Sequence, residues 1–135
     1  MMDTSYIDKL AFVYLKNKKV LETLSYGKDI WYIPGGKREG EESDQQALTR
    51  EVKEELNVDL IPQSIKLYGV FEAQAHGKPE GTVVRMSCYT AEFIGELQAG
   101  AEIAKLDYFS FDQKNLTSPV DHIIFDDLRK RGLIQ

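Results

Sequence analysis

The chain has 135 residues, of which 42% are hydrophobic and 29% charged, and a formal net charge of −5 at pH 7. This length and balance predict one globular domain over residues 1–135 and exclude a disordered or collagen-like chain. The negative charge argues against a broad nucleic-acid-binding surface, but it permits a small anionic substrate if a metal ion supplies positive charge. The longest apolar run, residues 10–15, is too short to span a membrane. A single cysteine, Cys88, and an N-terminus without a signal-peptide pattern predict a cytoplasmic protein.

Segments rich in aromatic and β-branched residues predict five or six strands, at 6–15, 20–26, 30–33, 64–75, 82–94 and 104–110. The first two are expected to form a hairpin through a polar turn. A helix is expected over about 43–56, and a second one begins with Ser118 as its N-cap and Pro119 at its first position. Because there is no repeated βαβ rhythm, this order predicts an α+β fold with a mixed sheet flanked by helices.

The first helix has clear start and packing signals. Ser43 followed by Gln46 forms a capping box, which predicts that the helix begins there. Leu48, Val52 and Leu56 are spaced four residues apart and predict an apolar stripe that faces the core.

Glu51, Glu54 and Glu55 fall within one arc of this helix, beside its apolar stripe. The placement is unfavourable for stability, because Glu51 and Glu55 form a like-charge i, i+4 pair that costs roughly 0.2–0.5 kcal/mol. The last turn of a helix also favours cations over acids. The simplest interpretation is a solvated acidic face. A divalent cation would instead make the three carboxylates favourable, since Mg²⁺ prefers hard oxygen ligands.

Together these residues resemble the signature of the Nudix hydrolase family, Gly-x5-Glu-x7-Arg-Glu-U-x-Glu-Glu-x-Gly-U, where U is bulky and aliphatic. Gly36 and Glu42 occupy the first two positions, and residues 50–58 supply Arg-Glu-Val-Lys-Glu-Glu-Leu-Asn-Val. The one departure is Asn57 in place of glycine. This position is expected at the helix C-terminus, where the chain usually turns into the left-handed region and Asn is the next most tolerant residue. We therefore expect a modest stability cost and no loss of chemistry.

The resemblance implies a Nudix-type three-layer α/β/α sandwich and hydrolysis of a phosphoanhydride with Mg²⁺, for which Mn²⁺ can substitute. It implies a set of metal ligands consisting of the Gly36 carbonyl, Glu51, Glu54 and Glu55. The implied catalytic set is Glu51, Glu54 and Arg50. Glu51 would orient or deprotonate the attacking water, while Arg50 would pair with Glu42 and position the glutamates.

Candidate residues also lie outside the acidic helix. Some Nudix relatives have a further acid before the late strand, and both Glu102 and Asp107 fit; we prefer Glu102 as an additional metal ligand. Lys37, Trp31 and His76 are candidates for substrate binding. Each has a simpler interpretation, because acids, lysines and loop histidines are usually solvated and an aromatic residue usually packs in the core.

The short chain resembles the MutT-like, nucleotide-sanitising branch. The leading function is therefore Mg²⁺-dependent hydrolysis of a nucleoside triphosphate or a related nucleoside diphosphate derivative. An alternative is hydrolysis of ADP-ribose, nucleoside diphosphate sugars or dinucleoside polyphosphates. An alternative of another class is a nucleotide-sensing Nudix module without turnover, although the complete acidic set argues against it. The expected partner is a small nucleotide, with no nucleic acid or membrane, and the protein is expected to be a monomer or homodimer.

Overall fold

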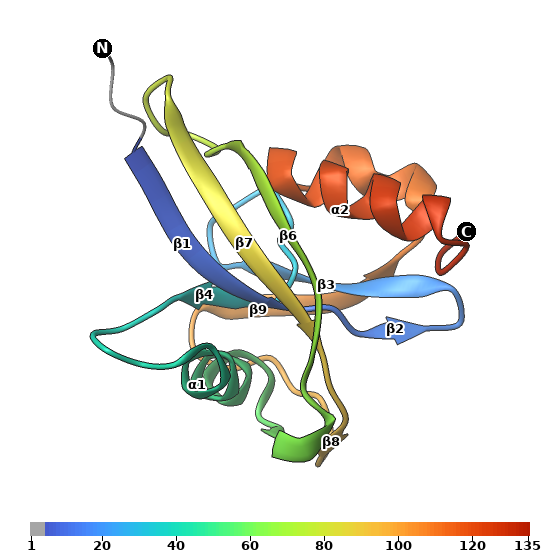
Figure 1. The fold of residues 1–135 in the computed structure, drawn as a ribbon. Helices are drawn as coiled ribbons and strands as arrows, with labels where there is room; N and C mark the ends of the chain where they lie inside the picture. The colour runs from blue at the N-terminus through green and yellow to red at the C-terminus, as the bar shows by residue number, and fades with distance from the viewer. Residues whose placement is uncertain (1–4) are drawn as a thin grey trace.

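The computed structural model describes residues 5–135 (Figure 1). Residues 1–4 lie outside the described residues. The expectation that the chain has no signal peptide rests mostly on these four residues. The helices are α1 (Asp44–Leu56) and α2 (Pro119–Lys130), with two short 3-10 turns at Pro62–Ser64 and Phe111–Leu116. The strands are β1 (Ser5–Phe12), β2 (Leu15–Lys16), β3 (Lys19–Ser25), β4 (Gly35–Lys37), β5 (Asp59–Leu60), β6 (Lys66–Gln74), β7 (Thr82–Thr90), β8 (Phe93–Ile94) and β9 (Ile103–Phe109).

A mixed four-stranded sheet in the order β4-β1-β7-β6 lies between the two helices. β1 and β7 are parallel, while β4 and β6 are antiparallel to their neighbours. A second sheet in the order β2-β3-β9 crosses the first, and a two-stranded sheet joins β5 to β8. Because α1 covers one side of the sheets and α2 the other (Figure 1), the predicted mixed sheet flanked by helices is confirmed. Neither helix within residues 5–135 has the length and hydropathy to cross a membrane.

β1 is one of the two inner strands of this sheet, and both of its faces are buried over Leu10, Ala11 and Phe12. Leu10 and Phe12 pack in one apolar cluster with the inner face of α1, whereas Ala11 packs in another with the inner face of α2. This alternation follows from the two-residue period of a strand. Burial of each large apolar side chain stabilises the fold by about 1.5–3 kcal/mol, so β1 holds the two cores together.

Three of the predicted strands differ from the structure. β1 does not form the expected hairpin with residues 20–26, because a strand buried on both faces pairs inside the sheet, with β7 and β4. The hairpin is made by β2 and β3, through Asn17 and Lys18 at φ 52° and 63°. Residues 30–33 form only isolated bridges, and the strand lies instead at Gly35–Lys37. The strand expected over 82–94 ends at Thr90.

α1 confirms the predicted helix signals. The Ser43 side chain accepts a hydrogen bond from the Gln46 amide, and the Gln46 side chain accepts one from Ser43, which completes the capping box. At the other end, Asn57 has φ 59° and ψ 29°, in the left-handed region. Its side-chain amide also donates to the Gln98 carbonyl at 2.9 Å. This hydrogen bond offsets part of the cost of having a side chain at that position.

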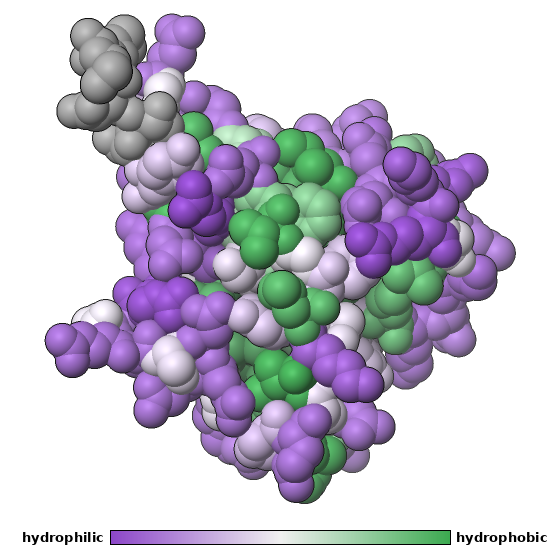
Figure 2. Space-filling view, viewed as in Figure 1, coloured by the Kyte–Doolittle hydropathy of each residue, from purple (hydrophilic) through white to green (hydrophobic). Residues whose placement is uncertain are grey.

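β6 forms the outer edge of the four-stranded sheet. Figure 2 shows apolar surface down the middle of this face, where Leu67 and Val70 of β6 are exposed. The Tyr68 hydroxyl donates to Asp127 of α2 at 2.6 Å. This hydrogen bond joins the edge strand to the helix that covers it.

Two carboxyl groups are buried between β3 and α2. Glu22 and Asp121 are both 0% exposed, and neither oxygen of Glu22 has a hydrogen-bond donor among the described residues. Asp121 accepts from the Ile33 amide at 2.9 Å. Burial, and then the nearby charge of Asp121, raises the pKa of Glu22, and burial also raises the pKa of Asp121. A proton retained by the pair would supply the missing donor.

These raised pKa values predict a protein that loses stability as pH rises. The folded state holds protons that the unfolded state has already released above pH ~4.5, so the free energy of unfolding falls until the folded pKa is passed. Glu22→Gln removes one ionisation and should increase the free energy of unfolding at pH 8 and flatten its decline with pH, as measured by urea unfolding at several pH values. Glu96→Gln, the same change at an exposed position, is the control. Identical pH dependence in wild type and Glu22→Gln would contradict this account.

Candidate active site

A pocket of about 380 Å³ lies between α1, β4 and the loop before β9. Glu51 and Glu55 of α1 line it together with Gly36 and Lys37 of β4. Glu102 lines the same pocket from the start of the late strand, and the Tyr26 amide donates to its carbonyl at 2.9 Å. The structure therefore brings together most of the predicted metal-binding residues in one depression.

The two glycines of β4 allow the backbone to approach α1. At Gly36, a Cβ atom would lie 2.6 Å from the Glu51 carboxylate, so only glycine leaves room for that side chain. Gly35 has φ 146°, and a Cβ there would lie 2.0 Å from the Leu10 carbonyl oxygen. Its amide donates to Glu55 Oε1 at 2.9 Å. The glycine pair thus fixes the position of both carboxylates.

Arg50 holds the acidic residues from the side. Its guanidinium forms a bidentate ion pair with Glu42, at 2.8 and 2.9 Å, and this charge-assisted hydrogen bonding lowers the pKa of Glu42 to about 2. The predicted Arg50–Glu42 pair is therefore present. Arg50 also contacts Glu51 at 2.9 Å and the Lys37 carbonyl at 3.1 Å. Glu54 is farther out, with a half-exposed side chain 3.4 Å from Arg50.

The pocket accumulates negative charge. Glu55 is only 6% exposed, and burial together with the neighbouring charges of Glu51, Glu102 and Glu54 raises its pKa to about 8. Burial also raises the pKa of Glu51, although Arg50 opposes this shift. Carboxylates crowded in this way are stabilised by a cation.

The oxygen donors fit a hard dication such as Mg²⁺. Within residues 5–135, however, no three His, Cys, Asp or Glu side chains stand in a ready-made metal-binding arrangement. Arg50 forms hydrogen bonds with Glu51 and with Glu54.

Two of the predicted site residues, Asp107 and Trp31, lie outside the acidic pocket. Asp107 lines a separate surface depression with Lys16 and Tyr108, away from the acidic pocket. Trp31 packs against Phe109, with ring centroids 4.9 Å apart. It lines neither the acidic pocket nor the smaller pocket beside it.

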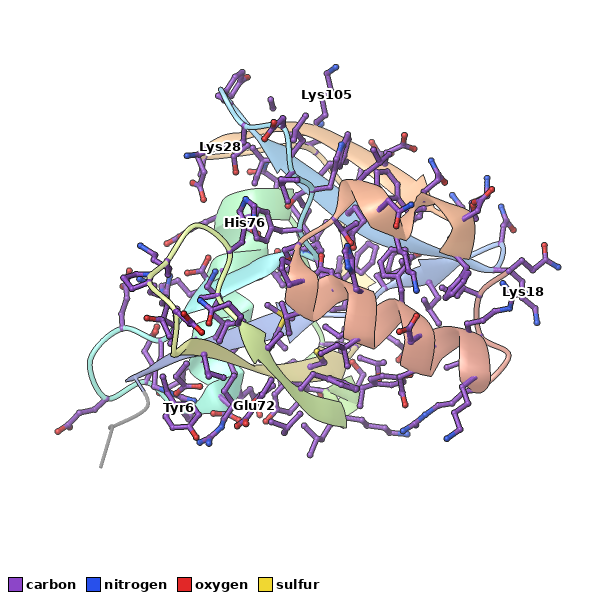
Figure 3. All side chains as sticks on the ribbon, turned by 90° about the horizontal axis from the view of Figure 1, so that it is seen from above. Tyr6, Lys18, Lys28, Glu72, His76 and Lys105 are labelled. Atoms are coloured by element: carbon purple, nitrogen blue, oxygen red, sulfur yellow. The ribbon has the colours of Figure 1, made fainter. Side chains whose placement is uncertain are left out.

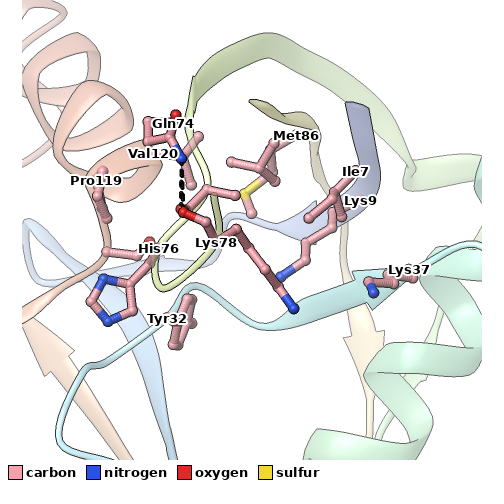
Figure 4. Close-up of a pocket in the computed structure, with 13 residues that line it drawn as sticks. Ile7, Lys9, Tyr32, Lys37, Gln74, His76, Lys78, Met86, Pro119 and Val120 are labelled. Atoms are coloured by element: carbon pink, nitrogen blue, oxygen red, sulfur yellow. Dashed lines mark hydrogen bonds between the residues drawn. The ribbon is translucent and has the colours of Figure 1, made fainter. Parts of the chain in front are cut away.

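A second pocket of about 210 Å³ adjoins the acidic one (Figure 4). His76 lines it from the loop between β6 and β7, near the start of α2 (Figures 3 and 4). Lys37 and Tyr32 line both pockets, and so does Lys9. Lys78 completes one wall.

Sequence reasoning missed Lys9, Lys78 and the buried pair of Glu22 and Asp121. For Lys9 a signal existed, since a lysine inside an apolar strand shares a face with Ile7 and Ala11. Lys78 lay in a segment interpreted only as a turn. Glu22 also interrupts an apolar run, but its partner Asp121 is distant in the sequence, so the pair gave no local signal.

The family model of the NUDIX domain matches residues 10–126. The chain therefore belongs to the Nudix hydrolases, enzymes that cleave pyrophosphate bonds and generally use divalent metals. The fold is accordingly the predicted Nudix type. No curated protein matches the chain in sequence.

Many solved structures share this fold, and three of them illustrate the similarity. The ORF135 protein of E. coli is 24% identical over 95% of this chain and 94% of that one, with a TM-score of 0.73. The MutT NUDIX hydrolase from Burkholderia pseudomallei is 22% identical over 93% and 97%, with a TM-score of 0.71. A UDP-X diphosphatase is 18% identical over 98% of this chain and 66% of that one, with a TM-score of 0.69.

The close approach at Gly36 predicts that this glycine is required. Gly36→Ala would place a methyl group 2.6 Å from the Glu51 carboxylate and displace it. Since a misplacement of about 1 Å can cost 10²-fold in rate, turnover should fall by roughly that factor while the circular dichroism spectrum is retained. Glu96→Ala, at an exposed position that does not line the acidic pocket, is the control. Equal turnover in wild type and Gly36→Ala would refute the steric argument.

Proposed function

We propose that this protein is a Mg²⁺-dependent pyrophosphohydrolase that cleaves a phosphoanhydride bond of a nucleoside triphosphate or a related nucleoside diphosphate derivative. The observation that carries the proposal is the cluster of Glu51, Glu55 and Glu102 in one pocket, beside the glycine pair of β4. Such a cluster repels a polyphosphate unless a dication lies between them. A role in sanitising the nucleotide pool is consistent with this activity.

The metal ligands in this proposal are the Gly36 carbonyl, Glu51, Glu54, Glu55 and Glu102. When bound, Mg²⁺ or Mn²⁺ supplies positive charge to the phosphoryl oxygens and increases the acidity of water. Glu55 is the most firmly placed of the glutamates, because it is buried and accepts a hydrogen bond from the Gly35 amide. Half of the Glu54 side chain faces solvent, so it is more accessible than Glu55.

The chain's own residues position and activate the reactants. Glu51 lies against Gly36 and is held by Arg50 at 2.9 Å, so its carboxylate is oriented to accept a proton from the attacking water. Arg50 is fixed by its bidentate pair with Glu42 and acts as a positioning residue. Lys37, at the rim shared by both pockets, contacts the phosphate chain.

A second candidate is hydrolysis of a nucleoside diphosphate sugar, favoured by the likeness of the fold to that of a UDP-X diphosphatase. The products separate the two activities. A triphosphate substrate would yield a nucleoside monophosphate and pyrophosphate, whereas a diphosphate sugar would yield a nucleoside monophosphate and a sugar phosphate. A panel of both substrate classes, assayed with Mg²⁺ and with Mn²⁺, distinguishes them.

Glu54→Gln should lower turnover by roughly 10²-fold, because a lost ligand or its support weakens metal-dependent activity by such factors. Chelation by EDTA should abolish wild-type activity, and added Mg²⁺ should restore it. Glu96→Gln changes an exposed acid elsewhere and should retain full activity. Unchanged turnover in Glu54→Gln would remove this residue from the proposed ligand set.

Metal affinity should rise with pH. The pKa of Glu55 is raised to about 8, so below that pH a binding dication must displace its proton. Affinity for Mn²⁺, followed by the electron paramagnetic resonance of the free ion, should increase by about tenfold per pH unit between pH 6 and 7.5. In Glu55→Gln the affinity should be lower and nearly independent of pH over this range. A flat profile in the wild type would show that Glu55 is not a ligand.

A further inference from the structure

The pocket next to the acidic one is lined by positive charge. Lys9, Lys37 and Lys78 face it from β1, β4 and the loop between β6 and β7 (Figure 4). Within residues 5–135, none of these three ammonium groups forms an ion pair with a carboxylate. The chain carries 22 acidic residues against 17 lysines and arginines. Three lysines without acidic partners around one pocket are therefore unexpected for its composition.

Lys9 is the innermost of the three. It is half-buried on β1, and its ammonium lies 5.6 Å from the centre of the Tyr32 ring. Burial lowers the pKa of Lys9, the charges of Lys37 and Lys78 lower it further, and Asp121 and Glu55 oppose the shift. The ammonium groups thus repel one another. An anion held among them would relieve this repulsion.

The loop that carries Lys78 is braced. The Gln74 side-chain amide donates to the Lys78 carbonyl at 3.3 Å (Figure 4) and to the Pro79 carbonyl at 2.9 Å. The Gly81 amide donates to Gln74 Oε1 at 3.0 Å, which closes the turn. The backbone of Lys78 is therefore held at the pocket rim, which reduces the entropy cost of ordering the loop on binding.

The two pockets are neighbours that share part of their lining. Lys9, Tyr32 and Lys37 line both of them, so one linear ligand can extend from the glutamates to the lysines. If the proposed function is correct, the phosphoanhydride that is cleaved lies at the acidic end. The part of the ligand at the other end then meets three ammonium groups. A phosphate group satisfies them, whereas an uncharged sugar leaves them unpaired.

We propose that Lys9, Lys37 and Lys78 bind a phosphate group of the substrate that lies outside the acidic pocket. The enzyme thereby selects substrates with three or more linked phosphates over diphosphate esters of uncharged sugars. This assignment rests on the proposed function for its account of catalysis. The anion site itself is a separate physical claim.

A binding experiment without metal tests the anion site independently of turnover. Inorganic tripolyphosphate is titrated into the full-length protein in EDTA at low salt, with the heat of binding as the readout. The wild type should bind, with an affinity that falls as salt increases. Lys78→Met and Lys9→Met should each weaken binding by about tenfold or more. Lys66→Met, the same change at an exposed lysine elsewhere on β6, should bind like the wild type.

Kinetics with the metal-loaded enzyme then test selectivity. Lys78→Met should raise KM for a nucleoside triphosphate by about tenfold and change kcat/KM for a nucleoside diphosphate sugar by less than about twofold. Tripolyphosphate binding that is unchanged in both lysine variants, or absent in the wild type, would overturn the anion site. Lysine-dependent binding by a protein that hydrolyses no nucleotide would support the site and reject the proposed function. Equal losses for both substrate classes would reject the selectivity.

Discussion

The close approach of the β4 backbone to α1 is the contact on which the site depends. Gly36 leaves space for the Glu51 carboxylate, and the Gly35 amide binds Glu55. Both acids are thereby held against a strand that is itself anchored to β1. The helix can tolerate its crowded carboxylates because the packing of Leu48, Val52 and Leu56 stabilises it from the other side. The fold thus supplies the stability that the acidic face lacks.

Charge is separated between two neighbouring pockets. Glu51, Glu55 and Glu102 make one end negative, and Lys9 and Lys78 make the other end positive. Lys37 of β4 lines both pockets and so lies where the two ends meet. A dication at one end and a free phosphate at the other are the charges that complement this arrangement. A ligand that reaches both pockets accounts for the glutamates and for the lysines, whereas a ligand in one pocket accounts for only one of these groups.

Local features were predictable from the sequence. The capping box of Ser43, the left-handed Asn57 and the Arg50–Glu42 pair depend on residues at most eight positions apart, whose spacing on or beside a helix is fixed by its geometry. The pairing of β1 with β7 was not predictable, because a strand buried on both faces looks the same whichever partner it has. Glu22 and Asp121 are distant in the sequence and meet only in the folded chain, so their pairing was not predictable either. Trp31 was proposed for substrate binding, but an aromatic residue beside a site motif can equally face the core, as this one does.

The parallel pairing of β1 with β7 also has a consequence for how the chain matures. Ser5 aligns with Thr82 and Phe12 with Tyr89, so β1 must wait for a partner that the ribosome produces much later. Until then Ala11 and Val13 lack the part of their apolar cluster that β7 and α2 contribute. Pairings of such sequence separation form slowly, and apolar strands left open during synthesis are prone to aggregate. Cotranslational chaperone protection of this first strand is therefore expected to govern the yield of folded enzyme.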